Sequence, residues 1–269
     1  MASSSIAVAG TAAEARQRHA VTDWWGGWRA GILTCLGFTG LFVGLAVYMH
    51  AFAWSAGIDA TSPEFGLYWR NLLILELVGV SAGTLGWWAW LARSGRALPA
   101  AVTHDEEVRR IMVFWGLLGA TCVVLYFMAS FFVSADAAWH QTAVRDTAFT
   151  PPHIVLFYCA FPLGITMTVG TYLYGVTRLP RVYPASAGFP WSFFILIAAS
   201  VTEMLQVALN EWGHSLWIAE EVFAAPLHWP FVIYVWLAAA MFALWLETLI
   251  RLLSIEKEIA DHRAQAART

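Results

Sequence analysis

Six apolar stretches, each long enough to cross a lipid bilayer as a helix, follow one another along this chain. They lie at about residues 30–54, 71–92, 111–133, 154–177, 190–209 and 229–250. With 59% hydrophobic and only 12% charged residues, the chain is also far more apolar than a soluble domain. The sequence therefore predicts an all-α fold, a polytopic transmembrane helical bundle of about six spans.

Basic residues are distributed unequally between the two ends of these spans. Only Arg70 and Arg145 fall on one side, and the other 13 of the 15 Lys and Arg residues fall on the opposite side. Those 13 are Arg16, Arg18, Arg29, Arg93, Arg96, Arg109, Arg110, Arg178, Arg181, Arg251, Lys257, Arg263 and Arg268. Because cytoplasmic loops carry the excess of basic residues, both termini are predicted to be cytoplasmic.

The chain divides into three predicted parts. Residues 1–28 are expected to be disordered or surface-lying, residues 29–251 to form the transmembrane domain, and residues 252–269 to form a cytoplasmic tail. The first segment has no apolar run followed by a cleavage site, so we expect no removable signal peptide. A phosphate-binding glycine loop and a basic nucleic-acid patch are also missing from the sequence, so no nucleic-acid partner is expected.

Two stretches of the chain repeat the same arrangement of polar residues. In the first, Asp136 precedes His140 by four residues, and His153 follows 13 residues later. In the second, the residues are Asn210, His214 and His228, with spacings of four and 14. Residues four apart share one face of a helix, so each stretch begins with an oxygen donor beside an imidazole. Each stretch therefore offers three donors of the kind that metals bind, and both are predicted on the outer face of the membrane.

The same residues also have simpler interpretations. Asp136 and His140 could form an interfacial ion pair, and Asn210 could cap a helix. The repetition of the pattern at a separation of 74 to 75 residues favours metal binding. Two imidazoles and a carboxylate could hold non-haem iron, copper or zinc, and the sequence alone leaves these metals open.

Carboxylates near these stretches are candidates for supporting roles. Glu203 lies two turns before Asn210 on the same helical face, within a predicted span, where a carboxylate is either functional or hydrogen-bonded to a neighbouring helix. Asp146 lies between the ligands of the first set and could orient an imidazole or pair with Arg145.

At these positions the sequence resembles the C subunit of the copper membrane monooxygenases, a family that includes particulate methane, ammonia and short-chain hydrocarbon monooxygenases. The matching strings are WHQTAVRDTAFTPPH, LNEWGH, APLHW, AWSAGIDATSPEF and TRLP. The resemblance covers about residues 48–250.

The resemblance implies a copper-dependent monooxygenase complex in the cell membrane. It implies A and B subunits as partners in a trimer of heterotrimers, with O2 as oxidant and a quinol as electron donor. It assigns Asp136, His140 and His153 to one copper site, and an adjacent second site to Asn210, His214 and His228. Two segments, SADAAWH and VTEMLQVA, depart from the family pattern and favour methane or another short-chain alkane over ammonia.

In such a complex Glu203 and Asp146 are the candidates for proton delivery. The alternative function, from another class, is a metal-binding scaffold or transport subunit without chemistry of its own. A transporter would place its polar residues near the middle of the membrane, whereas both ligand sets lie at its predicted outer boundary.

Overall fold

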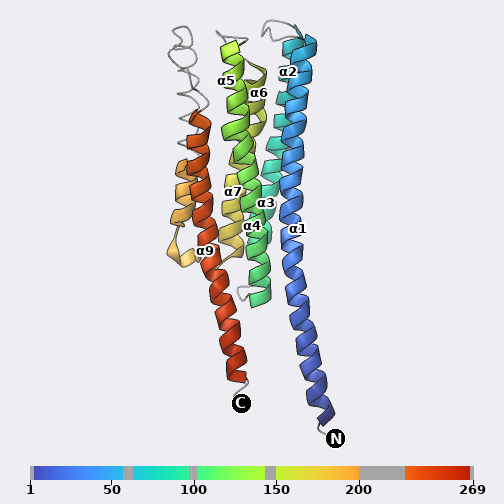
Figure 1. The fold of residues 1–269 in the computed structure, drawn as a ribbon, viewed down its shortest axis with the longest axis vertical. Helices are drawn as coiled ribbons and strands as arrows, with labels where there is room; N and C mark the ends of the chain where they lie inside the picture. The colour runs from blue at the N-terminus through green and yellow to red at the C-terminus, as the bar shows by residue number, and fades with distance from the viewer. Residues whose placement is uncertain are drawn as a thin grey trace.

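The structure is a computed structural model that describes residues 3–56, 63–96, 98, 102–142, 150–199 and 228–266. For residues 3–26, 54–56, 137, 140–142, 228–236 and 263 it describes the backbone only. All long elements in these ranges are helices that run side by side, nearly parallel to one long axis (Figure 1).

Three of the long helices are composite, each with a π-helical turn between two α-helical parts. The helices and their bounds are α1 (Ser3–Ala56), α2–η1–α3 (Pro63–Ile74, Leu75–Ser81, Ala82–Arg96), α4–η2–α5 (His104–Tyr126, Phe127–Phe132, Val133–Thr142), α6–η3–α7 (Pro151–Val155, Leu156–Ala160, Phe161–Arg178) and α9 (His228–Ala266). Residues 191–199 are also helical, and a short 3-10 turn, η4 (Ala185–Ala187), precedes them.

Five of the described helices are long and apolar enough to cross a membrane. They are Gly27–Ala53, Pro63–Arg96, His104–Asp136, Pro151–Arg178 and Leu237–Ala266. These five correspond to five of the six predicted spans, and the predicted span at 190–209 begins in the helix at 191–199 and continues outside the described residues. The prediction of an all-α, polytopic membrane bundle is confirmed.

Helix α1 is longer than the first predicted span. It begins at Ser3, so residues 3–28 have a helical backbone where the sequence predicted a disordered or surface-lying segment. The last helix likewise continues to Ala266, through most of the predicted tail. The division of the chain at residues 28 and 251 stays a prediction.

Helix α4 lies at the centre of the bundle and packs against α1, α7 and α9. Its contact with α1 is closest at Gly31 and Gly116, where a Cβ built on Gly31 would lie 2.6 Å from the Cα of Gly116. Only glycine fits at both positions, because small residues let membrane helices approach at backbone distance. The outward faces of α1 and α2–η1–α3 are apolar, as at Leu36 and Val78, which suits contact with lipid or another membrane subunit.

The three π turns lie next to one another in the bundle. Turn η3 contacts both η1 and η2. It directly precedes Pro162, which has no N–H for the helical ladder and whose ring would clash with a carbonyl of the preceding α turn. Turn η2 leads into α5, and η3 follows α6, so both flank the first predicted ligand set. Turns of this kind are frequent at functional sites.

Ion pairs join the basic segments at the opposite end of the bundle. The carboxylate of Glu107, 3% exposed, accepts hydrogen bonds from Arg181 at 2.6 Å and from Arg251 at 2.7 Å. His104 also pairs with Glu258 at 2.9 Å. Both chain ends lie toward this end of the molecule (Figure 1). Several basic segments therefore do lie on one side of the bundle, and their cytoplasmic location stays a prediction.

Candidate metal centre

The structure brings together two of the three residues of the first predicted ligand set. Asp136 is in the first turn of α5, and His153 is in α6, on the other side of the connection at 143–149. The Nδ1 atom of His153 lies 3.2 Å from Oδ2 of Asp136. Both side chains are sheltered, with 4% of the Asp136 side chain and 13% of the His153 side chain exposed. The carboxylate and the imidazole thus face each other in a largely water-free environment.

Thr150 fixes this pair from the start of α6. Its hydroxyl donates a hydrogen bond to Oδ1 of Asp136, and the same oxygen accepts the backbone N–H of His153 at 3.3 Å. The second contact is the N-cap of α6, with proline at the first helical positions. One fully buried side chain therefore orients the carboxylate and sets where the helix that carries His153 begins.

Two aromatic residues hold the same helix end. The hydroxyl of Tyr68, in α2, donates a 2.8 Å hydrogen bond to the backbone carbonyl of Pro151. The ring of Phe157 stacks on the imidazole of His153, with ring centroids 4.5 Å apart. Contacts of this kind limit rotation of the imidazole and keep it directed toward Asp136.

Sequence reasoning did not single out Thr150, Tyr68 or Phe157. For Thr150 a signal was present, because a threonine directly before two prolines is typical of a helix N-cap. For Tyr68 no local signal exists, since its partner lies 83 residues away in the sequence.

The other members of the two sets are described in part or not at all. The backbone of His140 lies one turn after Asp136 in α5, and its side chain is outside the described residues. His228 is the first residue of α9, again with the backbone alone described. That end of α9 points toward the same end of the bundle as α5 and α6 (Figure 1). Asn210 and His214 lie outside the described residues.

The proton-delivery candidates Glu203 and Asp146 also lie outside the described residues. A different carboxylate is described inside a span. Glu76 lies in η1, is half-buried, and accepts a 2.5 Å hydrogen bond from the hydroxyl of Ser81. This local hydrogen bond satisfies one of its oxygens within its own helix.

The Asp136–His153 pair fits a metal centre. Donor atoms each about 2.1 Å from one ion, at angles of about 90–110°, are roughly 3.0–3.4 Å apart, and the observed separation of 3.2 Å falls in this range. Among the described side chains no three His, Cys, Asp or Glu residues come together in this way. With His140 one helical turn from Asp136, the described part of the centre is a carboxylate and an imidazole on adjoining helices.

Fold and site together define a class: a polytopic membrane protein with a sheltered carboxylate–imidazole pair at one end of its helical bundle. Comparison with protein families gives a match over residues 10–258 to the family of the C subunit of ammonia monooxygenase and methane monooxygenase. The match spans nearly the whole chain, so the protein belongs to this family and is part of a membrane monooxygenase complex. A search among individually curated proteins gives no match.

Proposed function

We propose that this protein binds copper through Asp136, His140 and His153 and thereby contributes to oxidation of a short-chain alkane. The observation that carries the proposal is the sheltered contact between Asp136 and His153, held by Thr150. An anionic oxygen donor beside an imidazole suits a divalent transition metal. Bound copper would supply the capacity to exchange electrons with O2.

The residues of the chain supply the environment of that chemistry. Thr150 holds the carboxylate of Asp136 in place by its hydrogen bond, and Phe157 holds the ring of His153. Buried neighbours such as Phe132 and Val155, both fully buried, limit the access of water. A dry setting strengthens the electrostatic contact between these groups and disfavours release of reactive species.

A second copper site at Asn210, His214 and His228 is part of the proposal. Its support is the repeated spacing in the sequence and the position of His228 at the start of α9. Because Asn210 offers a neutral amide oxygen, this set carries less negative charge than the first. Glu203 and Asp146 remain the candidates for proton delivery.

The wider assembly follows from the family. We propose A and B subunits as partners in a trimer of heterotrimers, a quinol as electron donor, and both ligand sets on the outer face of the membrane. An apolar substrate suits a site that is reached from the bilayer. The segments SADAAWH and VTEMLQVA, beside the two ligand sets, favour methane or a longer short-chain alkane over ammonia.

The test is copper content and O2-dependent alkane and ammonia oxidation, measured on the complex purified in native lipid. His140→Ala and His214→Ala are each expected to lose copper from one set only, with at least tenfold weaker binding. His104→Ala is the matched control, since this histidine pairs with Glu258 at the opposite end of the bundle. If both variants kept full copper and activity, the ligand assignment would be wrong, and a scaffold role would explain the protein better.

A further inference from the structure

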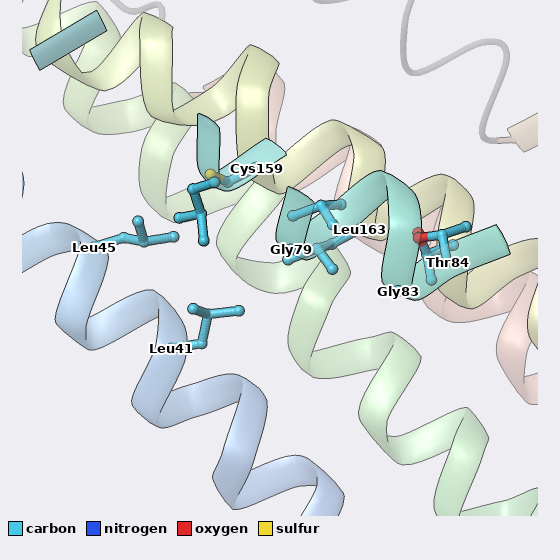
Figure 2. Close-up of a pocket in the computed structure, with 10 residues that line it drawn as sticks. Leu41, Leu45, Gly79, Gly83, Thr84, Cys159 and Leu163 are labelled. Atoms are coloured by element: carbon cyan, nitrogen blue, oxygen red, sulfur yellow. The ribbon is translucent and has the colours of Figure 1, made fainter. Parts of the chain in front are cut away.

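A cavity of about 280 Å³ lies between α1, the η1–α3 segment and the η3–α7 segment. Figure 2 shows Leu41 and Leu45 on one wall, Gly79 and Gly83 on a second, and Cys159 and Leu163 behind them. An engineered apolar cavity of about 150 Å³ suffices to bind benzene or xenon. The space between these helices is therefore large enough for a small organic molecule.

The cavity offers its occupant no open hydrogen-bonding group among the hydroxyls that line it. Thr166 donates its hydroxyl hydrogen to the carbonyl of Pro162 at 2.7 Å, and so accepts from Thr84, whose hydroxyl is 2.6 Å away. Glu76, the nearby carboxylate in η1, is not a lining residue and accepts from Ser81. A polar ligand would lose its hydrogen bonds with water here and gain none, so the lining selects a hydrocarbon.

The cavity opens on the outer surface of the spans. Leu41 is 37% exposed, and Gly79 and Gly83 are also exposed. A Cβ built on Gly83 would meet no atom within 4 Å. Molecules dissolved in the bilayer therefore have a lateral route into the space, past side chains that are absent at the two glycines.

The inner end of the cavity lies close to the first ligand set along the chain. Cys159 follows His153 by six residues on the same composite helix, which is an axial rise of about 9 Å. The same helix continues along the cavity to Leu163 and Thr166. Whatever occupies the cavity therefore lies on the membrane side of the Asp136–His153 pair.

We propose that this cavity binds a small free hydrocarbon taken from the bilayer and holds it within about two helical turns of the first ligand set. The inference rests on the proposed function for the identity of the ligand as a substrate of the complex. The binding itself depends only on the volume, lining and opening of the cavity.

The experiment uses the whole complex in lipid nanodiscs and a photoreactive probe, a short alkane of about five carbons that carries a diazirine. Peptide mapping after illumination is expected to find the probe on Cys159, Leu163 and the segment 79–84. An excess of unlabelled pentane is expected to remove this labelling.

Two glycine variants on one helix provide the matched comparison. Gly83→Leu fills the cavity and is expected to reduce labelling at Cys159 and Leu163 at least tenfold, with Gly83→Ala giving a partial loss. Gly86→Leu is the control, because Gly86 also has open space around it but does not line the cavity. Labelling that is unchanged in Gly83→Leu would overturn the proposal.

A second arm identifies the source of the hydrocarbon. A phospholipid with a diazirine on its acyl chain is expected to label the outer faces of the spans and not Cys159. If it labelled Cys159 and pentane did not displace it, an acyl chain would occupy the cavity and the proposal would fail. Pentane-sensitive labelling without any copper or alkane oxidation would instead overturn the proposed function and keep the binding site.

Discussion

The hydroxyl of Thr150 donates a hydrogen bond to the carboxylate of Asp136, across the connection between α5 and α6. The same hydroxyl oxygen caps α6 by accepting the N–H of His153. A single side chain thus links an oxygen donor of the candidate metal centre to the helix that carries the imidazole. Neither residue could shift without disturbing the other.

Replacing Thr150 by Val should weaken metal binding at the first set about 10- to 100-fold, the usual effect of losing a residue that orients a ligand. It should also remove the helix cap, at a cost of about 1 kcal/mol. Thr150→Ser retains the hydroxyl and should keep most of the metal. The measurement is copper retained per complex during titration with a chelator. Equal retention in the Val and Ser variants would show that Thr150 does not orient the centre.

The two ligand sets should differ in the order in which they lose copper. Asp136 supplies a charged carboxylate and Asn210 a neutral amide, so the second set should empty first under a chelator. Replacing Asn210 by Asp should raise copper retention there and lower turnover, because an added anion favours the oxidised ion. Stepwise chelation with element counting and spectroscopy provides the measurement. Earlier loss from the Asp136 set would mean that charge does not distinguish the two sets.

Removing the Glu107 carboxylate should destabilise the bundle. Glu107 is buried and accepts from both Arg181 and Arg251, so Glu107→Gln leaves two guanidinium groups with a weaker partner. Arg251 keeps its contact with Glu258, so the loss should fall at the lower end of the about 3–5 kcal/mol typical of broken buried pairs. Thermal unfolding of the complex measures it, with the exposed Glu64→Gln as control. A Tm equal to that of the control would show that the ion pairs contribute little.

Orientation can be read by labelling from the outer side of the membrane. A cysteine at residue 142, beside the first ligand set, should react with an impermeant maleimide in intact cells, and Ser186→Cys should not. Ser186 is exposed in the connection after α7, near the basic end of the bundle, and should react only after the membrane is opened. The reverse pattern would place the ligand sets on the cytoplasmic side.

The spans were predictable because each is a long apolar run, and a helix is how such a run satisfies its backbone in lipid. Residues 111–133 and 154–177, free of charge, fall within the described helices. The π turns η1, η2 and η3 were not predictable, because the same residues would continue an α-helix equally well. Their cause is tertiary packing, together with Pro162 in one case.

The candidate centre was predictable in outline from residue type and spacing. A histidine four residues after Asp136, and another at the start of the next apolar run, indicate donors from adjoining helices. The contact between Asp136 and His153 confirms that the fold brings those two positions together. The role of Tyr68 was out of reach, because it depends on how α2 packs against the start of α6.

The π turns make the orientation of the ligands depend on how many residues the helices contain. A helix turns by about 100° per residue, so deleting one residue from η2 or η3 and restoring regular α-helix would rotate everything beyond it by that angle. Asp136 lies beyond η2 in the chain, and His153 lies just before η3. The phase between the two side chains is therefore written into chain length, and comparison with other members of the family should treat a one-residue gap at these turns as a change of site geometry.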